Sequence, residues 1–366
     1  MKDRSNCCRV RVKLGRRSYW IYIGGLGSSS RELERVSSGR GVLLITDANV
    51  EKTGVVEDVL ERLSCASELG LIVLKPGERT KTLGAVGDIT GFAARNHYDR
   101  RSCFVALSGG VGGDLTGFAA GIYKRGVDFV QIPTTLLAMV DSSVGGKTGA
   151  DLPEGKNLVG LFHQPSAVFI DPAFLHTLPG REWRNGLAEV IKYGIIRDGE
   201  FFEFLWANRG RLNRRLADDA LLVKVIERCV RIKAEVVAAD ECESGVRAIL
   251  NYGHTFGHAL EQLSGFKLAH GSAVAIGMAL AGRLACELGI FDRALADKAE
   301  ALLKAVGLPV AIPSVYTASD IVEAMKGDKK NEGGRIRLVL PEAIGRVRIT
   351  SEVSEGSLLE FLKREV

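Results

Sequence analysis

The sequence lacks any long apolar run. Its longest stretches without Asp, Glu, Lys or Arg cover about fifteen residues, as in residues 268–282, and they still contain Gly, His and Ser. A membrane-spanning helix needs about twenty apolar residues. The first residues scatter Lys and Arg where a signal peptide needs an unbroken apolar segment. We therefore expect no membrane-spanning helix and no export.

Cysteine is sparse, and its pattern shows no pairing. The chain contains seven cysteines, an odd and dispersed set without a C-x-x-C pair. Such a set is typical of reduced thiols in the cytoplasm and not of a disulfide framework. The sequence thus predicts a cytoplasmic protein.

An excess of charge of one sign is also missing. The 49 basic and 44 acidic residues leave a formal net charge of +5, which is too balanced over this length for a dedicated nucleic-acid binder. Hydrophobic residues make up 46% and charged residues 25%, close to the average of globular proteins, which excludes a disordered or fibrous chain. A length of 366 residues favours two domains.

The two halves of the chain differ in hydrophobic periodicity. The first 170 residues alternate short β-branched or aromatic runs with helical patterns, which is typical of βαβ units and a mostly parallel sheet. Beyond Pro172, stretches with a period of 3.6 residues dominate. We predict an α/β domain over residues 1–171 and a mainly α-helical domain over residues 172–366. The predicted strands cover residues 19–23, 42–46, 71–74, 103–107, 129–132 and 167–170, and the clearest helical stretches cover residues 216–237, 273–288 and 294–306.

A glycine-rich segment follows one predicted strand. The strand over residues 103–107 leads into SGGVGGDL (108–115) and then into a helical pattern over residues 116–123. Glycines at such a turn let backbone N–H groups approach a pyrophosphate, and a helix N-terminus adds partial positive charge. Asp47, at the end of another strand, is suited to bind ribose hydroxyls. The alternative is that the glycines only form a tight turn.

The standard dinucleotide-binding fingerprint does not fit this segment. Leu115 stands where a third glycine is required, and the acidic residue precedes the glycines instead of following them by about twenty residues. We therefore expect a Rossmann-like domain whose strand order differs from the standard one.

Three of the six histidines lie between residues 254 and 270. His254 and His258 are four residues apart, so both project from one face if the segment is helical. A structural role for this pair remains an alternative to metal binding. Glu189, on the apolar side of another helical pattern, is a candidate third ligand because a buried carboxylate is costly unless it is paired or bound to a metal. Two imidazoles and one carboxylate leave an open position on Zn²⁺, as in catalytic sites.

Several segments, in order along nearly the whole chain, together resemble the 3-dehydroquinate synthase family. They are LGxRxYxIYIG (14–24), TDAN (46–49), PGERTK (76–81), GGVGGDL (109–115), KRG (124–126), PTTLLAMVDSSVGGK (133–147), GKN (155–157), NGLAEVIK (185–192), NYGHTFGHALE (251–261) with His270, and DKKN (328–331).

This resemblance implies an NAD-binding α/β domain, a helical domain with Zn²⁺ or Co²⁺, an active site in the cleft between them, and a homodimer in which Arg125 reaches the partner's site. It implies the conversion of the sugar phosphate 3-deoxy-D-arabino-heptulosonate 7-phosphate to 3-dehydroquinate and phosphate in the shikimate pathway. The implied steps are transient oxidation by NAD, phosphate elimination, re-reduction, ring opening and intramolecular aldol closure.

The resemblance also assigns roles to individual residues. The metal ligands match Glu189, His254 and His270. The cofactor positions match Asp47, Asn49, Glu78, Lys81, Gly110, Val111, Asp114, Thr134, Thr135, Lys147, Lys156, Thr177 and Leu178. The substrate positions match Arg125, Asp141, Lys147, Asn157, Lys192, Lys233, Arg247, Asn251, His258, Lys329 and Lys330. The catalytic positions match His258, Lys147, Asn157, Lys192 and Asp141.

These roles agree with the chemistry of the substrate. Lys147, Asn157, His258 and the two lysines 329 and 330 suit a phosphate, and Arg247 with Lys233 suits a carboxylate. One departure from the family pattern is Ser108, which replaces the first of three glycines. The alternatives to this function are a paralogous sugar phosphate cyclase, which tends to change Arg247, Asn251 or His258, and a metal-dependent polyol dehydrogenase.

Overall fold

The computed structural model describes residues 7–213, 217–327 and 336–366. The chain forms two compact units. The first combines Met1–Leu178 with Asp218–Cys242, and the second combines Pro179–Ala217 with Glu243–Val366. None of the described helices is long and apolar enough to cross a membrane.

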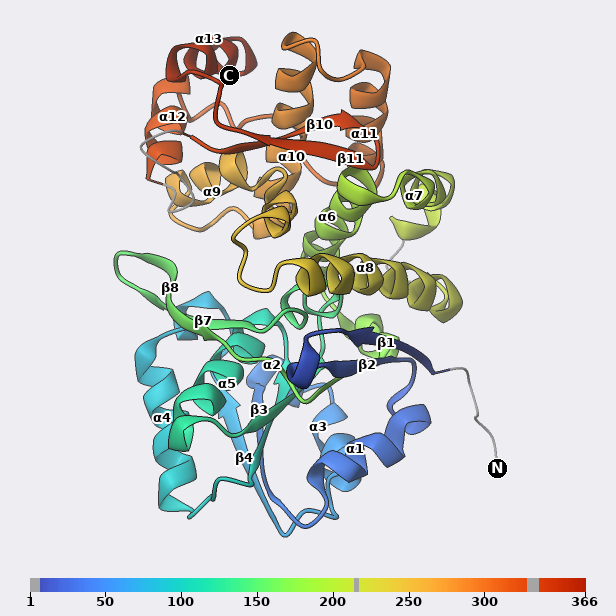
Figure 1. Ribbon diagram of the computed structural model, residues 1–366, viewed down its shortest axis with the longest axis vertical. Helices are drawn as coiled ribbons and strands as arrows, with labels where there is room; N and C mark the ends of the chain where they lie inside the picture. Colours follow the sequence, from blue (N-terminus) through green and yellow to red (C-terminus); the bar gives the residue numbers. More distant parts are fainter. Residues whose placement is uncertain (1–6, 214–216, 328–335) are drawn as a thin grey trace. The chain divides into compact units, whose positions relative to one another are not determined.

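The first unit contains a seven-stranded sheet with the order β1-β2-β9-β6-β5-β3-β4 (Figure 1). All neighbouring strands are parallel except β1 and β2. The predicted mostly parallel sheet with a non-standard strand order is therefore confirmed. The strands are β1 (Cys8–Val12), β2 (Tyr19–Ile23), β3 (Gly41–Asp47), β4 (Glu68–Leu74), β5 (Cys103–Ser108), β6 (Asp128–Pro133) and β9 (Ala167–Ile170).

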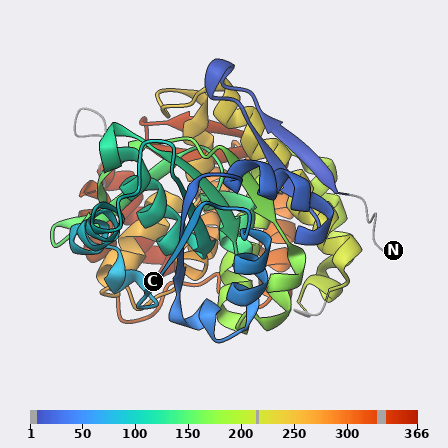
Figure 2. The same ribbon diagram turned by 90° about the horizontal axis from the view of Figure 1, so that it is seen from below.

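Helices cover both faces of this sheet (Figures 1 and 2). Leu43 and Ile45 of β3 point to one face and pack with α4 (Leu83–Arg95) and α5 (Gly110–Ile122). Val42 and Leu44 point to the other face, toward α1 (Ser30–Ser37) and α3 (Val55–Arg62). Because both faces are buried, the central strands are mostly apolar and show no regular alternation of polar residues.

The strand order has a switch point at the carboxyl edge of the sheet. From β3 the chain passes to β4 on one side, whereas β5, which comes next, lies on the other side of β3. Connections that diverge in this way leave an opening beyond the carboxyl ends of the two strands, where α/β proteins commonly bind ligands. In this chain those ends are Asp47 of β3 and Ser108 of β5.

Other elements of the first unit gather around the sheet. A two-stranded hairpin, β7 (Lys147–Leu152) and β8 (Gly155–Phe162), packs on the face covered by α4 and α5, and no strand was expected there from the sequence. The remaining short elements are η1 (Gly15–Arg17), η2 (Leu26–Ser29), α2 (Ala48–Glu51), η3 (Glu78–Thr80), η4 (Tyr123–Arg125), the π-helical turn η5 (Ala138–Ser142) and η6 (Pro172–Thr177).

Helix α8 (Asp219–Ala239) also belongs to the first unit. It packs against β1 and η5, and Lys233 on α8 donates hydrogen bonds to Asp141 in η5. The division expected from the sequence, with its border at residues 171/172, places this helix in the second domain. A helix's own periodicity does not reveal which partner its apolar face packs against, and therefore only the tertiary contacts assign α8.

The second unit is mainly helical, as predicted. Its one strand pair among the described residues is the hairpin of β10 (Leu338–Ala343) and β11 (Arg346–Thr350). Helix α10 is buried along most of its length. The helices are α6 (Gly180–Arg197), α7 (Gly199–Leu212), η7 (Val246–Asn251), α9 (His254–Leu263), α10 (His270–Glu287), α11 (Arg293–Ala305), α12 (Ala318–Lys326) and α13 (Glu355–Glu365).

Helix α5 begins earlier than expected. The sequence predicts a loop up to Leu115, but the helix starts at Gly110, so the glycines form its first turn. Glycine usually disfavours a helix, and here close packing requires it. A Cβ on Gly113 would lie 2.7 Å from Oε1 of Gln131 in β6, and one on Gly117 would overlap Thr148 in β7.

This packing predicts a stability difference between two helical glycines. Gly117→Ala should lower the free energy of unfolding by about 1–3 kcal/mol, because its Cβ would also lie 3.0 Å from the Phe129 ring in a filled core. Gly87→Ala, in α4, should raise it by roughly 0.5–1 kcal/mol, because its Cβ would meet nothing within 4 Å. Urea unfolding of both variants measures the difference, and equal effects would contradict the packing argument.

Candidate metal centre and nucleotide site

Three predicted metal ligands meet in the second unit. Glu189 in α6 is fully buried, His254 is the first residue of α9, and His270 is the first residue of α10. Oε1 of Glu189 lies 3.7 Å from Nε2 of His254 and 3.5 Å from Nε2 of His270. Donors about 2.1 Å from a tetrahedral Zn²⁺ lie about 3.4 Å apart. The three donor atoms therefore fit one divalent cation.

Further hydrogen bonds orient these ligands. Nδ1 of His254 lies 3.1 Å from the carbonyl oxygen of Tyr252, and Nδ1 of His270 lies 3.2 Å from Oε2 of Glu261. If Nδ1 carries the proton in each of these bonds, Nε2 is left to bind a cation, as in many metalloproteins. Lys192 donates to Oε2 of Glu189, so the other carboxylate oxygen faces the imidazoles.

The electrostatics of the cluster favour a cation. Burial lowers the pKa of His270, but hydrogen bonds to Glu189 and Glu261 outweigh burial and raise the pKa to about 10. Two carboxylates thus concentrate negative charge around one imidazole. Either a proton or a divalent cation can neutralise this charge.

Other predicted residues of the second unit lie close to the ligands in the chain or in space. The ring of His258, one turn after His254, is edge-on to the ring of His254 at 5.3 Å. His258, Glu261 and His270 form a second group of possible ligands. Arg247 is buried in η7, and Asn251 donates to Oε1 of Glu243 at 2.8 Å.

The predicted cofactor residues gather at the carboxyl edge of the sheet in the first unit. Asp47 occupies a central place there. Its Oδ1 accepts hydrogen bonds from the backbone N–H groups of Asn49 and Val50, and its Oδ2 accepts one from Ser108 Oγ at 2.9 Å. The Asp47 carboxylate therefore lies beside the glycine turn, as expected for a ribose-binding group. The neighbouring residues are Gly110, Val111 and Asp114 in α5, Thr134 and Thr135 after β6, and Glu78 and Lys81 after β4.

The edge has close backbone packing and a buried polar group without a partner among the described residues. Cβ atoms on Gly109 and Gly110 would lie 3.0 Å from Thr135 and 3.1 Å from Ser142, so the backbone of this turn is packed closely against its neighbours. The buried hydroxyl of Thr134 makes no hydrogen bond within the described part of the chain. A buried hydroxyl of this kind normally has a partner, and a bound nucleotide would supply one.

Lys81 connects the predicted cofactor and substrate residues. Its Nζ lies 2.6 Å from Oδ2 of Asp114 and donates a hydrogen bond to the side chain of Asn157 in β8. Burial lowers the pKa of Lys81, but the Asp114 carboxylate outweighs burial and raises it above its usual value. Lys81 therefore stays charged at this edge.

The remaining predicted residues of the first unit have defined positions. Lys147 begins β7, and Nζ of Lys156 in β8 lies 3.6 Å from Oε1 of Glu78. Asp141 accepts from Lys233, at 2.7 Å to its carboxylate. Thr177 and Leu178 end the first stretch of this unit, at and just after η6. Lys329 and Lys330 lie outside the described residues.

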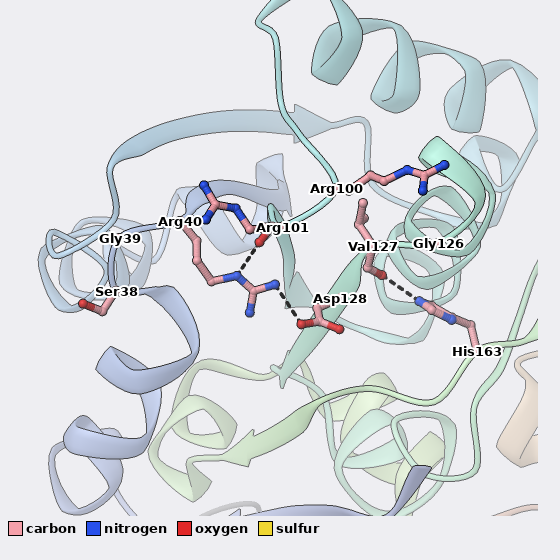
Figure 3. A pocket seen from close by; sticks show the side chains of 9 residues that line it. All are labelled: Ser38, Gly39, Arg40, Arg100, Arg101, Gly126, Val127, Asp128 and His163. Carbon is pink, nitrogen blue, oxygen red and sulfur yellow. Dashed lines mark hydrogen bonds and ion pairs between the residues drawn. The ribbon is translucent and has the colours of Figure 1, made fainter. Parts of the chain in front are cut away.

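Arg125 is the predicted residue that the first unit does not bring to this edge. It lies in η4, beyond the far end of α5, which is about 20 Å long. A hollow of about 650 Å³ lies near it, at the amino edge of the sheet (Figure 3). The Arg40 guanidinium in this hollow is held by the carbonyl of Arg101 and by Asp128. We therefore do not place the ligand site in this hollow.

Sequence reasoning missed the residues that support the site. Glu261 is three residues after His258 on α9, so helical spacing alone indicates a possible contact near the histidines. Lys192 was predicted as a substrate residue, but its hydrogen bond to Glu189, three residues before it on α6, was not. Asp151, whose carboxylate accepts the backbone N–H of Asn157, had no such signal, because the hairpin was not expected.

Known proteins resemble the chain over its whole length. Family models described as 3-dehydroquinate synthase N-terminal and C-terminal match residues 71–185 and 186–331. A 3-dehydroquinate synthase of Synechococcus sp. is 47% identical over 365 residues, covering 97% of this chain and 98% of the relative.

Two solved structures share the fold. A 2-deoxy-scyllo-inosose synthase, complexed with carbaglucose-6-phosphate, NAD⁺ and Co²⁺, is 25% identical with a TM-score of 0.88, covering 98% of this chain and 100% of that one. The 2-epi-5-epi-valiolone synthase of Streptomyces hygroscopicus subsp. jinggangensis, with NAD⁺ and Zn²⁺ bound, is 30% identical with a TM-score of 0.86. This match covers 94% of this chain and 95% of that one.

The fold is thus that of the sugar phosphate cyclases. Within this class, both family models are described as 3-dehydroquinate synthase, and the chain is 47% identical to a full-length 3-dehydroquinate synthase but 25% and 30% identical to the two synthases of other cyclic products. The chain belongs to the 3-dehydroquinate synthase family.

The geometry predicts which histidines bind a metal. Because Nε2 of His254 faces Glu189, His254→Ala should lower the affinity of the metal-free protein for Co²⁺ by at least about tenfold, since losing a ligand should cost no less than losing a residue that only orients one. His258→Ala should bind Co²⁺ nearly as wild type does. The visible absorption of bound Co²⁺, followed by titration, measures both. If His258→Ala loses Co²⁺ binding and His254→Ala keeps it, the metal site is instead the group of His258, Glu261 and His270.

Proposed function

We propose that this protein is a 3-dehydroquinate synthase of the shikimate pathway, and thus an enzyme of aromatic amino acid biosynthesis. It converts 3-deoxy-D-arabino-heptulosonate 7-phosphate to 3-dehydroquinate and phosphate. The observation that carries the proposal is the intact cluster of Glu189, His254 and His270 in a chain that is 47% identical to a 3-dehydroquinate synthase over nearly its whole length. Its expected location is the cytoplasm.

Two groups from outside the chain take part in this reaction. NAD⁺ accepts a hydride from the substrate and returns it, and Zn²⁺ or Co²⁺ polarises the oxygen on the reacting carbon. Glu189, His254 and His270 would hold the cation. Asp47 would bind the ribose hydroxyls of the cofactor, and the first turn of α5 would receive its pyrophosphate, because that turn presents unpaired backbone N–H groups.

The residues of this chain bind and orient the substrate. Lys147 and Asn157, with Lys156 nearby, suit the phosphate, because they supply positive charge and hydrogen-bond donors on one hairpin. Arg247 is buried and offers a planar fork for the substrate carboxylate, with Lys233 as a second cation.

The acid–base chemistry also falls to this chain. His258 is suited to hold or release a proton during phosphate elimination, and the substrate phosphate is a second candidate for this step. Lys192 keeps Glu189 oriented and, with Asp141, completes the proposed catalytic set. Holding the reactive sugar in one conformer contributes to the final aldol step.

One assay separates this function from its alternatives. With the heptulosonate phosphate and a trace of NAD⁺, the enzyme should release one phosphate per substrate over many turnovers, without net growth of NADH absorbance, because the hydride returns to the carbon it left. Phosphate release and absorbance at 340 nm are recorded together. Stoichiometric NADH without phosphate would indicate a polyol dehydrogenase, and inertness would indicate a paralogous cyclase.

We also propose that the active form is a homodimer in which Arg125 serves the partner's site. The support is its position beyond the far end of α5 from the glycine turn, within a family whose pattern places this arginine at the substrate.

Subunit mixing tests the dimer. Arg125→Ala and His270→Ala should each be nearly inactive, and subunits exchanged between them should recover about a quarter of the wild-type activity, since half the dimers are mixed and each has one complete site. No recovery, with exchange verified by a mass tag, would place Arg125 in its own subunit's site.

A further inference from the structure

The β7–β8 hairpin is joined to the segment that contains Glu78 and Lys81. Asp151 in β7 forms a parallel β-bridge with Thr82, and its backbone N–H donates to the carbonyl of Lys81 at 2.7 Å. The Lys156 ammonium lies 3.6 Å from the Glu78 carboxylate. The hairpin carries predicted phosphate-binding residues, and the segment carries predicted cofactor-binding residues.

The side chain of Asp151 has a separate task within this junction. Its Oδ1 accepts a hydrogen bond from the backbone N–H of Asn157 at 2.7 Å. Asn157 adopts a left-handed conformation with φ of +52°, which asparagine tolerates better than most residues. In this conformation its amide oxygen accepts from Lys81 Nζ, which also pairs with Asp114. Asp114, Lys81 and Asn157 are thus connected through their side chains, and the Asp151 carboxylate joins them through the Asn157 backbone.

The hairpin needs such a support near its tip. An isolated two-stranded hairpin is marginally stable, and within residues 7–213, 217–327 and 336–366 β7 and β8 pair only with each other apart from the bridge at Thr82. Ala150, Val159 and Leu161 are packed into the core beneath the hairpin, but Asn157 lies nearer the turn and is exposed. Packing of apolar side chains therefore does not set its conformation.

We propose that Asp151 is a positioning residue for substrate binding: by holding the backbone of Asn157 it sets the Asn157 side chain against Lys81 and fixes the phosphate-binding face of the hairpin. The proposal rests on the proposed function for the identity of the substrate. It assigns Asp151 no contact with the cofactor, so removal of its side chain should weaken substrate binding and leave NAD⁺ binding unchanged.

Two substitutions at Asp151 separate its hydrogen bond from its charge. Asp151→Ala removes the acceptor for the Asn157 N–H, whereas Asp151→Asn keeps a side-chain oxygen in the same place. We expect Asp151→Ala to raise the KM for the heptulosonate phosphate by about tenfold, the equivalent of one hydrogen bond, with a smaller fall in kcat. Asp151→Asn should stay within about twofold of wild type. Calorimetric titration of the protein with NAD⁺ should give dissociation constants within about twofold for all three proteins.

A matched control lies at the opposite edge of the sheet. Asp99 Oδ1 also accepts a backbone N–H, from Arg101 at 2.8 Å, and its hydrogen bonds within the described part of the chain involve only Arg101 and Ser102. Asp99→Ala should leave both KM and NAD⁺ binding unchanged. If it raises KM as Asp151→Ala does, the effect is one of general stability and the positioning role is wrong. An equal loss of substrate and NAD⁺ binding in Asp151→Ala would also overturn it.

Hydrogen exchange gives a readout that does not depend on activity. The Asn157 amide should exchange faster in Asp151→Ala than in wild type and remain slow in Asp151→Asn, as measured on a peptide that spans residues 155–160. Unchanged exchange in Asp151→Ala would overturn the proposal even if KM rises. If wild type releases no phosphate from the heptulosonate phosphate, the proposed function fails, and exchange at Asn157 then decides the positioning role alone.

Discussion

A fully buried carboxylate, Glu189, sets the arrangement of the second unit. Removing a carboxylate from water is costly unless opposite charge and hydrogen bonds replace the solvent. Lys192 supplies one partner from the same helix, and His254 and His270 supply two more from the first residues of α9 and α10. The segments that carry these side chains must therefore converge on one point. The same requirement makes the cluster a good cation site, because its remaining negative charge faces two imidazole nitrogens.

In the first unit, the corresponding constraint is the close packing of α5 against the sheet. Glycines in its first turns let the helix approach Gln131 and Thr148, where any larger residue would collide. The approach places the positive end of the helix beside Asp47 and Ser108, at the point where the strand connections diverge. The glycines therefore have a packing role that the sequence analysis did not consider beside a tight turn or a phosphate-binding turn. Their packing role explains why they lie within the helix and not before it.

The β7–β8 hairpin and the segment with Glu78 and Lys81 carry predicted ligand-binding residues. Polar contacts hold these two parts together more than apolar packing does. Lys81, Asp114 and Asn157 form one hydrogen-bonded group of two charged side chains and one amide at the edge of the sheet where the cofactor is expected. Such groups hold precise positions because every buried donor needs its acceptor. These polar contacts also explain why the β7–β8 hairpin, which has few core contacts of its own, can hold Lys147 and Lys156 in defined positions.

Local pattern was sufficient to predict much of this protein. Short β-branched or aromatic runs located β2, β3, β5 and β9 to within a residue or two, because strand burial leaves a mark in short segments. Helical spacing and the cost of a buried carboxylate indicated His254, His258 and Glu189 as candidate ligands, and the family resemblance put His270 in the place of His258. Contacts between distant segments leave no such mark. The start of α5 at Gly110, the β7–β8 hairpin, the packing of α8 on the first unit, and the link from Asp151 to Asn157 each depend on what lies opposite in space. Only the tertiary structure decided these features, since a residue's own neighbours in the chain do not reveal which distant backbone it will meet.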